Sequence, residues 1–123
     1  MSWSENLKER CFSSTAAVRD TLLDAWGFVD MSGNAQEWVY DWHSQSYAAC
    51  GADCLGVDPR GPCGGAEPCT GHRRRVVRGG SWYWPASHSR TYRRRAHMPS
   101  NRPYHHFGFR CAASPAEAEA LSR

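Results

Sequence analysis

The sequence predicts one small α+β domain whose core consists of a few large aromatic residues among many polar connections. The 123 residues include six Trp, five Tyr and four Phe, although the mean hydropathy is −0.68. Residues 38–42 alternate aromatic and other side chains, and this period of two predicts a strand with one aromatic face. Residues 50–69 combine Gly, Pro and four cysteines, which predicts an irregular loop without a helix or a central strand. A chain of this length can bury one core, mainly through its aromatic residues.

The stretch before the predicted strand has the composition of a cation site. Two carboxylates, Asp30 and Glu37, flank Gly33 and Ala35, whose small side chains allow their backbone carbonyls to turn inward. A set of carboxylate and carbonyl oxygens, with no His or Cys nearby, favours calcium over zinc or copper. Asp30 and Glu37 are alternatively ordinary turn and surface acids, and their spacing alone leaves both interpretations open.

Three sequence blocks occur in the order of a known family. They read G-F-V-D-M-S-G-N-A-Q-E-W at residues 27–38, R-V-V-R-G-G-S-W at residues 75–82 and G-F-R-C at residues 108–111. On these blocks the chain resembles the formylglycine-generating enzyme family, also called sulfatase-modifying factors. The resemblance implies a C-type-lectin-like fold with little regular secondary structure and short antiparallel strands. It covers the C-terminal half of the family's domain.

The resemblance also implies a domain organisation and a calcium site. Calcium would bind Asp30, the carbonyls of Gly33 and Ala35, and Glu37. A first calcium site of the catalytic members is expected to be absent, because Arg10 stands near its remaining ligands. We expect an N-terminal extension, the family-like domain with the Cys-rich loop at 50–69, and a tail that forms a short capped helix or a frayed end. These three segments are residues 1–14, 15–113 and 114–123.

The cysteines of the predicted loop have two alternative roles. Four thiolates could hold zinc, but the paired Cys-x2-Cys spacing of a zinc knuckle is missing. Two disulfides would hold the same loop and would imply an oxidising compartment, which favours a secreted or periplasmic protein. We prefer disulfides, partly because two cysteines then remain as a third pair. The family's G-F-R-C cysteine pairs with a residue in the absent half, so Cys11 as its substitute is our inference. The six cysteines are Cys11, Cys50, Cys54, Cys63, Cys69 and Cys111.

The resemblance places an active site after residues 75–82, but the catalytic residues are replaced. In catalytic members, two cysteines lie three and eight residues beyond the serine that matches Ser81, and they bind copper. Trp84 and Ser89 occupy these positions here, and neither side chain offers the soft thiolate that copper(I) needs. We therefore expect no copper, no catalytic residue and no oxidase chemistry of the family's kind.

Residues 82–106 have the aromatic, Arg and small polar composition of binding surfaces. Some of these aromatic residues are alternatively plugs of an irregular core, and we assign Trp82, Phe107 and Phe109 to the core. The residues expected to contact a ligand are Tyr83, Trp84, His88, Arg90, Tyr92, Tyr104, His105 and His106.

Residues 70–114 contain ten arginines and no acid, within a net charge of +3. Arginines interleaved with aromatic residues could bind nucleic acid. We favour the alternative that the guanidiniums pair with N-terminal acids or donate to loop carbonyls, because no recognised nucleic-acid module is present. The lack of carboxylates also argues against a transition-metal site at four histidines in this stretch. They are His88, His97, His105 and His106.

These observations favour a calcium-stabilised binding module for a protein or small-molecule ligand. A special case is the variable protein of a diversity-generating retroelement, which resembles this family and varies in the same segment. The alternatives are a metal-dependent oxidase with altered ligands, the C-terminal half of a sulfoxide synthase of ergothioneine biosynthesis, or a structural domain of a secreted or surface protein. No apolar run has the length of a membrane span. A homo-oligomer or a partner chain could complete the domain.

Overall fold

A four-stranded mixed sheet forms the centre of the fold in the computed structural model, which describes residues 15, 17, 24–99 and 104–122. The strand order is β3-β2-β1-β4; β1 pairs antiparallel with β2, β2 antiparallel with β3, and β1 parallel with β4. The expectation of antiparallel strands is therefore confirmed for two ladders and wrong for β4. The strands are β1 (Gln36–Trp42), β2 (Arg75–Arg78), β3 (Arg95–His97) and β4 (Phe107–Gly108). The helices and 3-10 turns are α2 (Tyr47–Cys50), η2 (Gly51–Cys54), η3 (Pro62–Gly65), η4 (Ala86–Ser89) and α3 (Pro115–Leu121).

Strands β1 and β2 supply the most deeply buried side chains. Val76 and Val77 are 1% and 0% exposed, because β-branched residues at the middle of the sheet are covered on both faces. Trp38 lies opposite Val77, and the register shifts between Trp38 and Trp42. The predicted aromatic strand is thus confirmed, but Tyr40 is 57% exposed while Trp42 is buried.

The Cys-rich loop folds over one end of β1 and is held by two disulfides, Cys50–Cys54 and Cys63–Cys69. This confirms the preferred disulfide interpretation of these four cysteines over the zinc site. The Gly- and Pro-rich sequence was expected to exclude helix, yet it forms the short turns η2 and η3, since one 3-10 turn needs few residues. Cys111 carries a free, exposed thiol and Cys11 lies outside the described residues, so the third pair stays a prediction.

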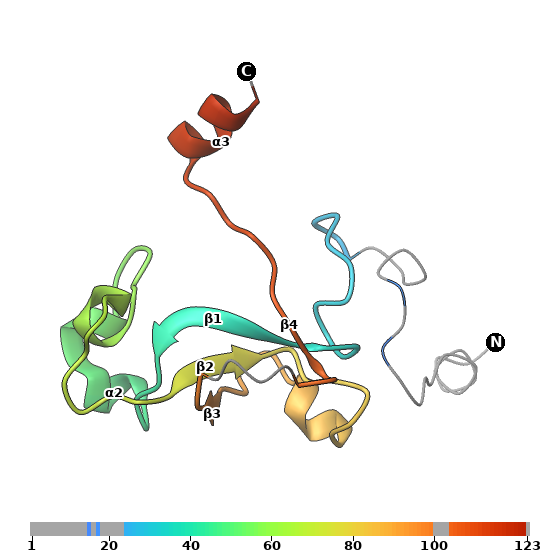
Figure 1. The fold of residues 1–123 in the computed structure, drawn as a ribbon, viewed down its shortest axis with the longest axis horizontal. Coiled ribbons are helices and arrows are strands. Elements are labelled where there is room, and N and C mark those ends of the chain that lie inside the picture. The colour runs from blue at the N-terminus through green and yellow to red at the C-terminus, as the bar shows by residue number, and fades with distance from the viewer. Residues whose placement is uncertain (1–14, 16, 18–23, 100–103, 123) are drawn as a thin grey trace.

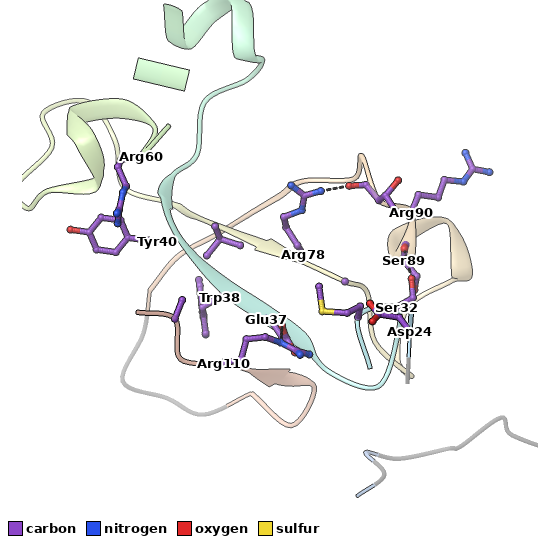
Figure 2. A pocket seen from close by; sticks show the side chains of 15 residues that line it. Asp24, Ser32, Glu37, Trp38, Tyr40, Arg60, Arg78, Ser89, Arg90 and Arg110 are labelled. Carbon is purple, nitrogen blue, oxygen red and sulfur yellow. Dashed lines mark hydrogen bonds and ion pairs between the residues drawn. The ribbon is translucent and has the colours of Figure 1, made fainter. Parts of the chain in front are cut away.

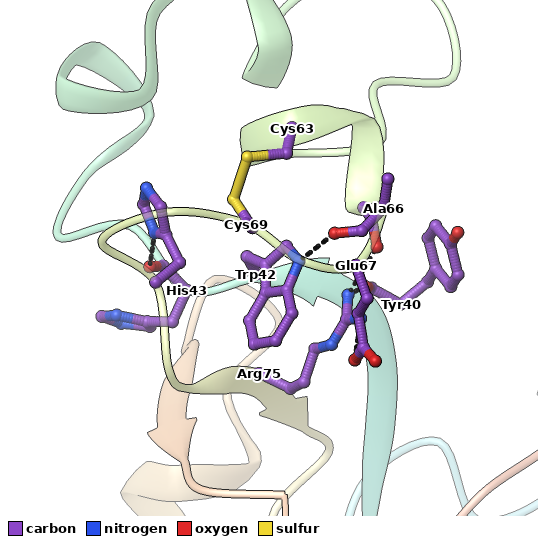
Figure 3. The surroundings of a disulfide bond; sticks show 10 residues. Tyr40, Trp42, His43, Cys63, Ala66, Glu67, Cys69 and Arg75 are labelled. Carbon is purple, nitrogen blue, oxygen red and sulfur yellow. Dashed lines mark hydrogen bonds and ion pairs between the residues drawn. A yellow bond between two sulfur atoms is a disulfide. The ribbon is translucent and has the colours of Figure 1, made fainter.

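Arg75 and Trp42 connect this loop to the sheet (Figure 3). The Trp42 indole nitrogen donates to the carbonyl of Ala66 at 2.8 Å, and the Arg75 guanidinium carbon lies 3.7 Å from the Trp42 ring centroid. Arg75 also donates to the carbonyls of Tyr40 and Gly65 and to Glu67. One arginine thus braces the loop in the way that the acid-free, Arg-rich sequence predicted.

The C-terminal part of the chain leaves the sheet after Gly108 (Figure 1). The last strand, β4, is therefore only two residues long. Phe109 is 77% exposed, so its assignment to the core is wrong, because no strand neighbour covers it beyond β4. Trp82 and Phe107 are half-buried.

The predicted capped helix is present as α3, which follows an extended segment (Figure 1). Ser114 and Glu117 form a reciprocal capping box, and this box satisfies backbone donors at the helix start. No described helix is long and apolar enough to cross a membrane. The predictions for residues 1–14, including Arg10, lie outside the described residues.

Candidate binding site

Two glycines after β2 bring three distant segments together. Gly79 and Gly80 have φ values of 86° and 71°, a region that glycine enters without steric cost. A Cβ at Gly80 would lie 2.8 Å from both the backbone nitrogen and the Cα of Ser89, so only glycine allows this approach. Gly33 donates to the Gly79 carbonyl at 2.7 Å, and Ser32 donates to the Ser89 carbonyl at 3.0 Å. The acidic loop, the end of β2 and η4 therefore meet at one point.

The acidic loop contains the residues predicted to bind calcium. Asp30 and Asn34 both have positive φ, and the Asn34 amide donates to Asp30 at 3.2 Å. The Ala35 carbonyl oxygen would be 4.0 Å from a Cβ at Gly79, so it is directed toward the turn after β2. Gly33 donates its N–H to Gly79, and this bond ties the acidic loop to the end of β2.

Glu37, the fourth predicted ligand, is bound by an arginine that the sequence did not single out for this role. Arg110 donates from Nε to Oε2 at 2.6 Å and from Nη2 to Oε1 at 2.5 Å. These hydrogen bonds raise the pKa of Arg110 above its ordinary value, and the charges of Asp30 and Asp24 act in the same direction. Arg110 therefore holds Glu37 directly, while Asp30 is paired with Asn34.

The donor chemistry at this loop fits calcium. All four predicted ligands offer oxygen, and a carboxylate has enough lone pairs to bind Arg110 and an ion together. Among the described residues, no three His, Cys, Asp or Glu side chains form a metal cluster.

A groove of about 750 Å³ lies beside the acidic loop (Figure 2). Figure 2 shows Arg78 and Arg90 along one part of it and Glu37 with Arg110 along another. Arg78 donates to the Thr91 carbonyl, and Arg90 donates to the Tyr92 hydroxyl at 2.7 Å. The lining residues are Asp24, Met31, Ser32, Glu37, Trp38, Val39, Tyr40, Arg60, Arg78, Gly79, Ser89, Arg90, Thr91, Arg110 and Ala112.

Six of the eight predicted ligand contacts gather elsewhere, in a group of rings that we call the ring cluster. Its members are Tyr83, Trp84, His88, Tyr104, His105 and His106, together with Trp38, Trp82, His97 and Phe107. Tyr83 stacks on His106 at 5.0 Å between ring centroids, and Trp84 stacks on His88 at 5.3 Å. The other two predicted contacts, Arg90 and Tyr92, pair with each other beside the groove.

Exposure divides the ring cluster into a rim and a floor. Tyr83 and Tyr104 are 53% and 37% exposed, and His105 is also exposed, so these side chains can meet a ligand directly. His106 is 8% exposed, and burial lowers its pKa below the ordinary value of histidine. Trp84 is half-buried. The prediction of ligand contact therefore suits the rim, while the alternative of an aromatic plug describes His106.

The sequence analysis missed two residues on the floor of the ring cluster, Arg95 and Gln36. Arg95 lies on β3 opposite Val77, and its guanidinium carbon is 4.3 Å from the Trp84 ring centroid. Its Nη1 donates to Gln36 Oε1 at 3.1 Å. The excess of arginines in residues 70–114 was the available signal, but it could not show which arginine would face the ring cluster.

The sheet, its long irregular connections and the loop beside β1 define a C-type-lectin-like fold. The sequence profile of the sulfatase-modifying factor enzyme 1-like domain family matches residues 2–115, and the chain belongs to this family. Formylglycine-generating enzyme of Thermomonospora curvata is 34% identical over 107 residues, which are 85% of this chain and 33% of that protein. The Streptomyces coelicolor enzyme of the same name is 37% identical over 110 residues, 87% of this chain and 32% of the relative.

The chain thus spans about a third of the length of these relatives. Among solved structures, Treponema denticola variable protein 1 superposes with a TM-score of 0.55 and 24% identity. The superposition covers 79% of this chain and 31% of that one. At this identity the likeness concerns the fold alone.

Proposed function

We propose that this chain is a calcium-stabilised, non-catalytic binding module of its family, with its ligand surface in residues 82–106 and centred on the exposed rim of the ring cluster. The observation that carries the proposal is the replacement of both copper-binding positions. Trp84 packs against His88 and Arg95, and Ser89 packs against Gly80. Within the described parts of the chain, Cys111 is the one cysteine outside a disulfide, and a single thiol cannot replace a copper-binding pair.

The rim has the chemistry of a protein-binding surface. Tyr side chains offer large contact area with few rotatable bonds, and their hydroxyls remain available for hydrogen bonds. Tyr83 and Tyr104 present such rings beside the exposed imidazole of His105. The two disulfides support a secreted or periplasmic location, because such bonds persist in oxidising compartments.

A more specific form of the proposal is the variable protein of a diversity-generating retroelement. The fold shared with Treponema denticola variable protein 1 supports it. Sequencing of sibling genes tests this form: differences concentrated between Tyr83 and His106 would support it, and differences spread evenly along the chain would contradict it.

Calcium is tested on the purified chain by elemental analysis and by thermal melts with calcium or chelator. We expect about one calcium per chain and a lower melting temperature after chelation. Glu37→Gln should lose the calcium response, since the neutral amide is a weaker ligand for a hard cation. Arg73→Gln, at an exposed site, serves as the control. Equal melting temperatures with calcium and with chelator would contradict this part.

Binding is tested by panning the immobilised chain against a displayed random-peptide library and a small-molecule library. Selected ligands should lose affinity for Tyr83→Ala and His105→Ala. Tyr47→Ala is the matched control, because Tyr47 is 48% exposed and lies outside the ring cluster. An assay for oxidation of a cysteine-containing peptide with copper covers the enzymatic alternative. Formation of formylglycine there, or failure to select any ligand that depends on the rim, would overturn the proposal.

A further inference from the structure

Arg95 is a half-buried cation without a counter-charge. Among the described residues no Asp or Glu forms an ion pair with it; its partners are the Gln36 amide oxygen and the face of Trp84. Arginine remains protonated in proteins, so it cannot relieve the cost of burial by losing its proton. A buried charge is normally paired, so an anion at Arg95 would supply the counter-charge that the described residues do not.

Four buried polar atoms of Gln36 and the ring cluster also lack partners among the described residues. They are Gln36 Nε2, Trp84 Nε1, His88 Nδ1 and His106 Nδ1. Buried polar groups in folded proteins are nearly always hydrogen-bonded, so four orphaned atoms in one cluster indicate a group from outside the described chain. Gln36 is 0% and His106 8% exposed, so bulk water does not satisfy them.

The orphaned atoms define the chemistry of the missing group. Arg95 can only donate, which fixes the Gln36 oxygen toward it and leaves the Gln36 NH2 group as a donor. The Trp84 indole N–H also only donates, and each histidine Nδ1 donates in one tautomer. Several donors around one guanidinium suit a carboxylate, which has two oxygens and one negative charge. A phosphate monoester carries more charge than this single cation balances.

We propose that the floor of the ring cluster binds a carboxylate of a peptide ligand at Arg95, with Gln36 and Trp84 as further donors. Tyr83 stacks on His106 and is 53% exposed, so it is the exposed ring above this part of the floor. The carboxylate comes from an Asp or Glu side chain or from a free C-terminus. This inference rests on the proposed function, because it assigns a chemical class to the ligand of the same surface.

The test follows the Trp indole N–H signals of the 15N-labelled chain by NMR. The probes are acetyl-glutamate amide for a side chain, acetyl-glycine for a C-terminus, acetyl-glutamine amide as the neutral match, and inorganic phosphate. We expect the Trp84 signal, assigned with Trp84→Phe, to shift with one or both carboxylates and not with the neutral amide. The carboxylate probe that binds more tightly shows whether the natural ligand offers an acidic side chain or a C-terminus. Equal shifts with the neutral probe, no shift, or a shift with phosphate alone would overturn the inference.

Two variants sharpen the test. Arg95→Gln should weaken carboxylate binding at least tenfold, whereas Arg73→Gln removes the same charge from an exposed site and should leave binding unchanged. Gln36→Glu places a carboxylate beside Arg95, so it should raise the melting temperature and block the probes. This second variant remains informative if Arg95→Gln fails to fold. Ligands that need Tyr83 and His105 but tolerate Arg95→Gln would refute this inference and leave the proposed function standing.

Discussion

Arg110 binds Glu37 through both carboxylate oxygens and also donates to the carbonyl of Val29 at 3.0 Å. The arginine follows β4 and the glutamate belongs to β1, so this pair joins segments that are 73 residues apart. Because the planar guanidinium makes two parallel hydrogen bonds, a lysine ammonium cannot reproduce the arrangement.

Arg110→Lys should lower the free energy of unfolding by about 1 kcal/mol, a small value because the pair is partly exposed. Urea denaturation at low salt measures it, and Arg73→Lys at an exposed site is the control. Equal midpoints for the two variants would show that the bidentate pair adds no stability.

Gly80→Ala should destabilise the fold by about 2 kcal/mol or more, because a Cβ there meets the backbone of Ser89 in addition to the strain of positive φ. Gly71→Ala is the matched control: its φ is 84° and no atom lies within 4 Å of the added Cβ. It should cost only about 1 kcal/mol from the backbone strain. Thermal or urea melts that rank the two variants in the opposite order would disprove the close approach.

Replacing Cys63 and Cys69 together by Ser should cost about 2 kcal/mol, since this bond closes a short loop in the unfolded chain. The loop holds the Ala66 carbonyl against the Trp42 indole, so the fluorescence of Trp42 should also change. The double replacement of Cys50 and Cys54 removes a similar constraint and should leave Trp42 fluorescence unaltered. A fluorescence change in both variants would argue against this local effect.

Stability should fall as the pH drops below about 6.5. Burial lowers the pKa values of His43, His88 and His106 in the folded state. At a pH between the lowered pKa values and the ordinary histidine pKa, the unfolded chain therefore binds more protons than the folded chain. The free energy of unfolding therefore rises with pH through that window and levels off above it. Urea melts between pH 5 and pH 8 measure the slope.

His106→Phe should flatten this pH dependence in part, since Phe keeps a ring beneath Tyr83 but does not titrate. Tyr83→Phe is the control, because it preserves the stacking and leaves all histidines in place. An unchanged slope in His106→Phe would show that His106 does not contribute to the pH dependence of stability.

Local patterns predicted the elements that depend on neighbours in sequence. The alternation at residues 38–42 and the capped helix in the tail both appear in the structure. The two disulfides also join cysteines only 4 and 6 residues apart. For these features, pattern and spacing contain most of the required information.

The remaining features depend on contacts between distant segments. Arg95 is positioned by the pairing of β3 with β2 and by its hydrogen bond to Gln36 on β1. No local sequence pattern predicts this contact between three strands. The parallel β4 and the exposed Phe109 follow equally from the path of the chain around the sheet. The sequence therefore predicted a ligand surface by composition but could not separate its rim from its floor.

The backbone beneath this surface is anchored by main-chain groups. The Trp82 N–H donates to the Asn34 carbonyl at 3.1 Å, Trp84 to Ser81 at 3.3 Å and His88 to Pro85 at 2.9 Å. Such bonds do not depend on which side chain each donor residue carries. The scaffold can therefore accept new side chains at the rim without being rebuilt, and the same frame can evolve toward many targets.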